Sequence, residues 1–180
     1  MKFYTGVGSR NTPKNIQEVM VALAYKLSKK KYILRSGGAE GADYAFEYGC
    51  RNANSNMEIF LPWDGFNNLY NDLEHFLLNN FNNIEQATII AKTYHPNFDK
   101  LSPGAQKLMT RNSYQVLGQD LNTMSEFLVC WTPDACTSME DRTQKTGGTG
   151  QAIAIASDYG LPIFNLALKE HRERILAFVK

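Results

Sequence analysis

The amino-acid sequence predicts one domain of the α/β class, with three layers and a mostly parallel sheet of about five strands. Short apolar segments alternate along the chain with longer segments that carry apolar residues at helical spacing. Three of the apolar segments end in glycine-bearing turns that lead into the next helix. The chain has 180 residues, of which 43% are hydrophobic and 21% charged, so it can bury one substantial core. These observations predict a single Rossmann-like domain over residues 1–180, without internal repeats or a second-domain boundary.

The strands are predicted where short apolar runs are bounded by glycine, proline or polar residues. The first run ends in the turn that contains Gly6, and the fourth is apolar throughout, as expected of a strand buried on both faces. The five predicted strands are Lys2–Val7, Tyr32–Leu34, Glu58–Leu61, Phe127–Trp131 and Pro162–Leu166.

The helices are predicted from apolar spacing and from signals at their ends. In the first helix, Val19, Leu23 and Leu27 recur every four residues after Pro13, a residue that favours a helix start. Lysines at its end are favourably placed at the negative pole of the helix dipole. The predicted helices run from Pro13 to about Lys30, from the turn after Ser36 to about Arg51, over Ile84–Tyr94 and Pro103–Gly118, from the Gly147–Gly150 turn to Gly160, and over Lys169–Lys180.

Two segments fit neither pattern. The asparagine-rich segment from Phe66 to Asn83 is predicted to form an elaborated loop or short helices, because several large side chains in and before it can pack. The segment from Thr132 to Thr146 is predicted to be a polar loop. The side chains expected to pack are Trp63, Phe66, Tyr70 and Phe76.

Composition argues against several classes of function. With 19 basic and 18 acidic residues the net charge is +1, whereas a charge-driven grip on duplex DNA needs a basic excess. No apolar run approaches the ~20 residues of a membrane span. The start of the chain lacks the features of a signal peptide, so we expect a cytoplasmic protein. Cys50, Cys130 and Cys136 have neither paired spacing nor an even count, and His95 has no second ligand nearby. We therefore expect reduced thiols, no metal and no cofactor.

Three glycine-bearing turns are the main functional signal. Gly6–Arg10, Ser36–Gly41 and Gly147–Gly150 each follow a predicted strand and precede a predicted helix. In an open parallel sheet these turns lie at one edge, where glycine lets the backbone approach a phosphate and free N–H groups attract it. They match neither the ATP-binding P-loop nor the dinucleotide fingerprint, whose third glycine is replaced by Asn11. We therefore expect the three turns to converge on one phosphate-binding cleft.

Side chains near the turns supply the other candidates. Arg10 and Arg111 can each neutralise a phosphate, with a solvated arginine and a structural ion pair as their respective alternatives. Asp43 can bind a ribose hydroxyl or serve the helix dipole, and Trp63 and Trp131 can stack on a base or belong to the core. The predicted ligand-binding residues are Gly8, Ser9, Arg10, Arg35, Ser36, Gly37, Gly38, Asp43, Arg111, Asn112, Gly147, Gly148, Thr149, Gly150 and Gln151.

These residues resemble a known superfamily. Val7–Arg10, Ser36–Asp43 and Arg111–Asn112 stand in the order seen in the Rossmann-type domain of DNA-processing protein A, which shows Val-Gly-Ser-Arg, Ser-Gly-x-Ala-x-Gly-x-Asp and Arg-Asn. The Gly147–Gly150 turn is more similar to the lonely-guy phosphoribohydrolases, and together these families form the SLOG superfamily. The resemblance covers Phe3–Leu166. Compact members with the Lys-Thr-Gly-Gly-Thr-Gly-Gln-Ala segment also resemble proteins often encoded by bacteriophages, which would place this chain in the host cytoplasm.

The lonely-guy pattern is incomplete in this chain. Those enzymes cleave the N-glycosidic bond of nucleoside 5′-monophosphates with an arginine, for which the resemblance implies Arg111, and with the glutamate of Gly-Gly-x-Gly-Thr-x-x-Glu. Here the glutamate position is Ala154 and the threonine position is Gln151. Alanine can neither activate a water nor stabilise an oxocarbenium ion. The carboxylates that could replace the missing acid are Glu40, Asp43 and Asp120.

The sequence therefore predicts a protein that binds a nucleotide or a nucleotide-derived small molecule, for instance to sequester a signalling nucleotide in phage counter-defence. It leaves open whether a reaction follows, and Ala154 at the glutamate position favours binding alone. One alternative is a nucleoside 5′-monophosphate N-glycosidase or another nucleotide hydrolase. A second alternative is a recombination mediator that binds single-stranded DNA, which the charge balance and the lack of an appended winged helix disfavour. A homo-oligomer is left open.

Overall fold

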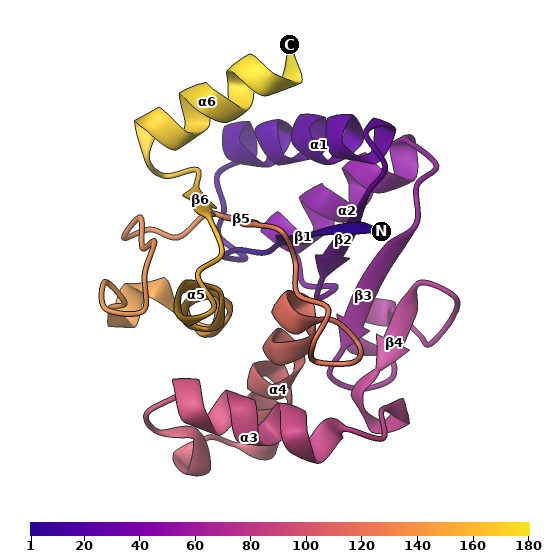
Figure 1. Cartoon of the computed structure of the whole chain (residues 1–180), viewed down its shortest axis with the longest axis vertical. Helices are drawn as coiled ribbons and strands as arrows, with labels where there is room; N and C mark the ends of the chain where they lie inside the picture. Colours follow the sequence, from indigo (N-terminus) through magenta and orange to yellow (C-terminus); the bar gives the residue numbers. More distant parts are fainter.

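All six strands of the sheet run parallel in the computed structural model, which describes all 180 residues (Figure 1). Their order is β4-β3-β2-β1-β5-β6, so the α/β class and the parallel sheet predicted from the sequence are confirmed. The strands are β1 (Lys2–Gly6), β2 (Tyr32–Ser36), β3 (Met57–Leu61), β4 (His75–Leu77), β5 (Leu128–Cys130) and β6 (Ile163–Asn165).

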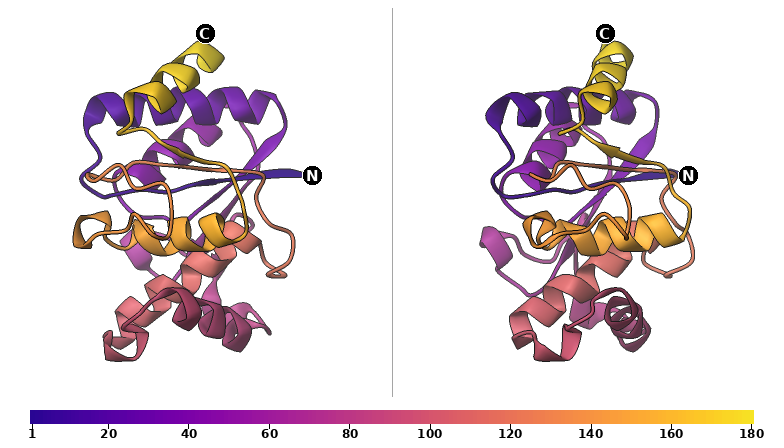
Figure 2. Two further views of the ribbon diagram at one scale, coloured as in Figure 1. Left: turned by 60° about the vertical axis from the view of Figure 1, so that its left-hand side comes forward. Right: turned by 90° about the vertical axis from the view of Figure 1, so that its left-hand side faces the viewer.

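Helices cover both faces of the sheet and complete three layers. Figure 2 shows α1, α2 and α6 on one side of the strands, with α5, α4 and α3 on the other. Each α-helix lies close to its predicted range. The helices are α1 (Lys14–Lys29), α2 (Ala42–Asn52), α3 (Ile84–Tyr94), α4 (Pro103–Leu117), α5 (Thr149–Asp158) and α6 (Lys169–Val179), and the short 3-10 helices are η1 (Phe66–Asn68), η2 (Leu78–Asn80), η3 (Phe98–Lys100) and η4 (Gln144–Thr146).

The sheet separates two apolar cores. Neighbouring strand residues point to opposite faces, so Ile59 packs with the core under α1 and α2, whereas Phe60 packs with the core under α4 and α5. In the second core the ring of Tyr114 stacks on Phe60 and on Phe81, with centroids 5.7 and 4.4 Å apart. Burial on both faces explains why the strands read as continuous apolar runs.

Strand β4 is the main element that the sequence did not reveal. It lies inside the segment predicted as a loop or short helices, and it raises the strand number from about five to six. Only three residues pair with β3, in the register Ile59↔His75, Phe60↔Phe76 and Leu61↔Leu77. A strand of three residues is too short to show an alternation of apolar and polar residues, and it forms by pairing with the edge of β3.

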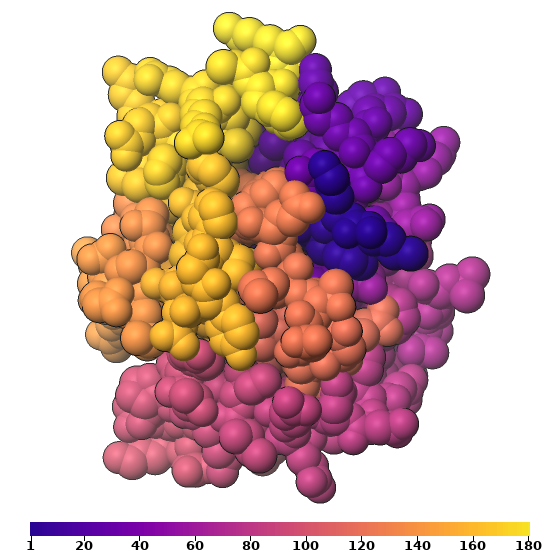
Figure 3. Space-filling model, in the orientation of Figure 1, coloured from indigo at the N-terminus to yellow at the C-terminus, as the bar shows by residue number.

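The surface shows how distant parts of the chain come together. In Figure 3 the N-terminal residues, in indigo, remain exposed beside orange residues from the second half of the chain. This agrees with the pairing of β1 with β5, in which Thr5 aligns with Leu128. None of the helices combines the length and apolar composition that crossing a bilayer requires.

The order of the strands reverses at β1. The chain moves outward from β1 through β2, β3 and β4, and then crosses to the other side of β1 to form β5 and β6. The turns after β1 and β5 therefore leave the sheet in opposite directions, and a crevice opens between them.

Candidate functional site

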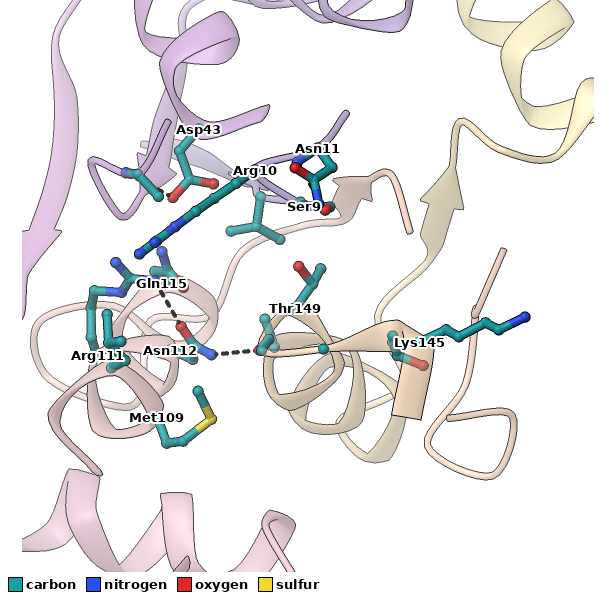
Figure 4. A pocket seen from close by; sticks show the side chains of 18 residues that line it. Ser9, Arg10, Asn11, Asp43, Met109, Arg111, Asn112, Gln115, Lys145 and Thr149 are labelled. Atoms are coloured by element: carbon teal, nitrogen blue, oxygen red, sulfur yellow. Dashed lines mark hydrogen bonds between the residues drawn. The ribbon is translucent and has the colours of Figure 1, made fainter. Parts of the chain in front are cut away.

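A cleft of about 390 Å³ lies at this reversal point (Figure 4). The turn after β1 lines it with Gly8, Ser9 and Arg10, and the turn before α5 lines it with Gly147 and the residues up to Thr149. The segment after β2 reaches it through Ala39 and Asp43. The first and third turns therefore meet at one cleft through their glycines, whereas the second turn contributes Ala39 and neither Gly37 nor Gly38, which were predicted to line it.

Helix α4 forms the wall opposite the first turn. Arg111 is only 8% exposed, and its Nη1 donates a hydrogen bond of 2.7 Å to the carbonyl oxygen of Gly37. Its Nη2 lies 3.5 Å from Oδ1 of Asn112, whose Nδ2 donates to the carbonyl oxygen of Gly148 over 3.1 Å. The predicted pair Arg111 and Asn112 thus connects the second turn with the third across the base of the cleft (Figure 4).

Gln115 is a cleft residue that the sequence analysis missed. It is 1% exposed and lines the cleft one helical turn beyond Arg111, yet neither its Oε1 nor its Nε2 has a hydrogen-bond partner. Buried amides are normally paired, so this side chain is available to a ligand. The spacing of four residues from Arg111 was the signal in the sequence that could have identified it.

Two guanidinium groups face the cleft without an ion-pair partner. No carboxylate oxygen lies within 4.0 Å of a nitrogen of Arg10 or Arg111. Nε of Arg111 has no hydrogen-bond partner of any kind. In Figure 4 the exposed side chain of Arg10 extends between Asp43 and Arg111, whereas Lys145 points away from this group. Two positive charges therefore face Asp43 as the one carboxylate of the cleft, and neither arginine forms an ion pair with it.

The second turn does not offer its N–H groups to a ligand. The N–H of Ala39 donates to Oδ2 of Asp43 over 3.3 Å, and the N–H of Gly37 lies near the same carboxylate and lowers its pKa. The N–H of Gly38 lies near the carboxyl group of Glu47, one turn further along α2, and lowers its pKa. The phosphate-cradle role predicted for Gly37 and Gly38 is therefore corrected, because neither residue lines the cleft and both lie beside the protein's own carboxyl groups.

The two carboxylates of α2 are buried and close to each other. Asp43 and Glu47 are each 2% exposed. Burial raises the pKa of Asp43 to about 6, although Arg111 opposes the rise. Burial, together with the charge of Asp43, raises the pKa of Glu47 to about 8 in spite of Arg51. At neutral pH Glu47 therefore carries a proton in the folded chain.

Replacing Glu47 by glutamine is expected to stabilise the protein at neutral pH. In the unfolded chain Glu47 ionises near 4.5, whereas in the folded chain it keeps its proton to about 8, so folding becomes less favourable as the pH rises between these values. Glutamine does not ionise and so avoids this loss, and we expect a gain of about 3 kcal/mol in the free energy of unfolding at pH 7. Urea unfolding at a series of pH values measures it. The gain should vanish near pH 4, while the exposed control Glu140→Gln should show no such trend; a gain independent of pH contradicts the assignment.

The first and third turns keep donors free for a ligand. The N–H groups of Gly8 and Arg10 have no partner within the protein, and neither do those of Gly148 and Thr149 at the start of α5. Helix α5 has no side-chain cap at its N-terminus, and of its first residues Thr149 lines the cleft with a free N–H, whereas the N–H groups of Gly150 and Gln151 bond to Gly147 and Gly148. The hydroxyl of Ser9 accepts from the N–H of Asn11 over 3.1 Å and keeps its proton to donate. These turns therefore have the groups that the sequence predicted.

Two glycines serve close packing of the turns against each other. A Cβ on Gly8 would lie 2.6 Å from Cβ of Ala42, and a Cβ on Gly41 would lie 2.5 Å from the carbonyl oxygen of Arg10. The φ of Gly41 is +78°, which also favours glycine. The first turn and the start of α2 thus meet backbone to backbone.

Asp134 fixes the loop that leads into the third turn. Its Oδ2 accepts hydrogen bonds from the hydroxyls of Thr143 and Thr146. Partial burial opposes ionisation, but these hydroxyls hold the pKa of Asp134 at about 2. Thr146 lies on the wall of the cleft, so the loop predicted to be polar is tied to Asp134 next to the site.

Several predicted residues lie outside the cleft. Arg35 is 2% exposed, and its Nε is 2.6 Å from Oε2 of Glu58, so its charge is neutralised within the protein. The hydroxyl of Ser36 donates to the carbonyl oxygen of Gly6 over 2.7 Å. Gln151 is buried and donates from Nε2 to the carbonyl oxygen of Ala91. Together with Gly150, Gln151 lines a neighbouring cavity instead.

Neither tryptophan forms a wall of the cleft. The ring of Trp63 meets Phe66 edge-on, with centroids 5.2 Å apart. Trp131 packs against the core under α1 and α2, and its carbonyl oxygen accepts from the N–H of Ser9 over 3.1 Å. Neither ring is therefore placed to stack on a base in this cleft.

The positions considered for a catalytic acid also differ in whether they line the cleft. Ala154 is fully buried in α5 and does not line the cleft, so a glutamate at this position would enter the core. Glu40 is exposed and does not line the cleft, and Asp120 caps the backbone of Asn122 and Thr123 beyond α4. Of the three proposed replacement carboxylates, only Asp43 faces the cleft.

Comparison with models of known families, with curated proteins and with solved structures finds no match for this chain.

Proposed function

We propose that this protein binds a phosphorylated small molecule of the nucleotide type in the cleft between the first and third turns. The single observation that carries the proposal is the pair Arg10 and Arg111, two guanidinium groups at one cleft that have no carboxylate partner within 4.0 Å. A buried arginine is normally paired with an acid of the protein. An anionic ligand would supply the missing partner.

The surroundings favour a phosphate over a simple halide or carboxylate. Free N–H groups from two turns and the start of α5 surround the same space, and a phosphate can accept from several donors at once. The unpartnered amide of Gln115 offers both a donor and an acceptor deeper in the cleft. A volume of about 390 Å³ leaves room for a sugar and a base beside the phosphate.

A comparison of AMP with adenosine tests the proposal. AMP should raise the melting temperature of the protein in a concentration-dependent way, while adenosine, which lacks the phosphate, should not. The variant Arg10→Gln should lose most of the AMP effect without a change in its own melting temperature, because Arg10 is exposed and bonds to nothing in the empty protein. If none of the common nucleoside 5′-monophosphates stabilises the protein, the proposal fails. Binding of an oligothymidine strand in that case would support the DNA alternative.

A hydrolase is the second candidate, and the observation that favours it is Asp43. This carboxyl group faces the cleft, and its pKa of about 6 suits a group that gives and takes a proton near neutral pH. The same AMP incubation distinguishes the two functions when the nucleotide is recovered and analysed by mass spectrometry. Unchanged AMP supports a binding protein, whereas free adenine that disappears in Asp43→Asn supports a hydrolase.

A further inference from the structure

A second cavity of about 460 Å³ adjoins the cleft at the third turn. The two cavities share Met109, Thr146 and Gly147 as a common wall. A Cβ built on Gly147 would meet no atom within 4 Å, so the space beside this residue is open. The two cavities are therefore adjacent, with open space beside Gly147 at their common wall.

The second cavity contains a buried amide with one free acceptor. Gln151 is 2% exposed, and its Nε2 donates a hydrogen bond of 2.9 Å to the carbonyl oxygen of Ala91 on α3. This bond fixes which end of the amide is oxygen, and Oε1 has no partner. The wall of the cavity thus includes a buried acceptor without a partner, a group that a ligand N–H can pair with.

A positively charged side chain borders the same cavity. Arg142 donates from Nε to the carbonyl oxygen of Met139 and from Nη1 to the carbonyl oxygen of Tyr94, at 3.1 and 2.8 Å. It makes no ion pair within 4.0 Å. His95 and Asn97 add further polar groups. The cavity suits a flat polar group with N–H donors, such as the edge of a nucleobase, next to an anionic linker.

We propose that the second cavity is the subsite for a second nucleoside unit, so that the ligand is a dinucleotide of two nucleosides joined through phosphate. This proposal rests on the proposed function, because the first unit is the one held at Arg10 and Arg111. Each cavity alone has the size of a small-molecule pocket, and a mononucleotide that fills the first leaves the second empty. Gln151 then recognises the second base through Oε1.

Calorimetric titration with AMP, ADP and the linear dinucleotide pApA tests this assignment. The dinucleotide should bind at least about tenfold more tightly than AMP, and ADP, which adds a phosphate without a second nucleoside, should not reproduce the gain. The variant Gln151→Met should weaken pApA binding by about threefold to tenfold, the worth of one hydrogen bond, and leave AMP binding unchanged. The matched control is Gln106→Met, since Gln106 also bonds to backbone carbonyls through Nε2 but lines neither cavity.

A rim variant keeps the test independent of the packing role of Gln151. Asn97 is exposed at the edge of the second cavity, so Asn97→Trp should fill the cavity without disturbing the core, and should weaken pApA binding but not AMP binding. Equal affinities for pApA and ADP would overturn the second subsite and leave the phosphate site intact. Parallel losses of AMP and pApA binding in both variants would also overturn it, because the second cavity would then hold part of a mononucleotide. If neither nucleotide binds, the proposed function itself fails.

Discussion

Replacing Arg35 by methionine is expected to lower the free energy of unfolding by about 3–5 kcal/mol, the range for breaking a buried ion pair. The guanidinium bonds to Glu58 and to the carbonyl oxygen of Thr123, and its carbon lies 3.7 Å from the centroid of the Phe3 ring. It thereby joins β2 to β3 and to the segment before β5. Methionine leaves the carboxylate of Glu58, which is 16% exposed, without its counter-charge.

Urea unfolding of Arg35→Met, Glu58→Met and the double variant measures this effect. The double variant should lose much less than the sum of the single variants, because each single change leaves one charge unpaired and the double change leaves none. Phosphate binding should persist in every variant that folds, since Arg35 does not line the cleft. A loss below about 1 kcal/mol in Arg35→Met would contradict a structural role for this pair.

Replacing Arg111 by methionine is expected to weaken ligand binding without lowering the stability of the protein, the opposite of what is expected for Arg35. AMP binding should weaken by roughly tenfold to a hundredfold, the worth of a charge-assisted hydrogen bond, while the empty protein should unfold at no lower urea concentration than the wild type. Arg111 is buried, as Arg35 is, but forms no ion pair within 4.0 Å, and burial lowers its pKa. Removing an unpaired buried charge offsets the loss of its hydrogen bond to Gly37.

The two arginines are matched controls for each other, because both are buried and both receive the same substitution. Stability and AMP affinity are measured for both variants in the same buffer. A strong loss of stability in Arg111→Met together with unchanged AMP affinity would show that Arg111 serves the fold, and would remove the main support for a phosphate site.

The fold was predictable because its elements have strong local signals. Apolar runs without polar interruption predict strands buried on both faces, and β1, β3 and β5 form within the predicted ranges or one residue beyond them. Strand β4 has no such signal, since three residues in an asparagine-rich segment become a strand only through pairing with β3. Neighbours in space decide elements this short.

The site was predictable only in part, because position in the chain does not reveal what a side chain faces. Arg10 and Arg35 both stand near the ends of strands, yet one reaches the cleft and the other pairs with Glu58, the residue aligned with it on β3. Glycine-rich turns are ambiguous for a similar reason. The second turn has the expected glycines, but they do not line the cleft, and the N–H of Ala39 donates to Asp43.

The backbone contact between the first turn and the start of α2 affects how a mutational scan of this protein would read. Substitutions at Gly8 or Gly41 force atoms into space already filled by Ala42 or by the backbone of Arg10. Such variants would lose ligand binding because the whole turn is displaced. A mutational scan would therefore score these glycines like residues that contact the ligand. Side chains such as Arg10 and Gln115 can be shortened without moving the backbone, so substitutions there report direct contact with the ligand.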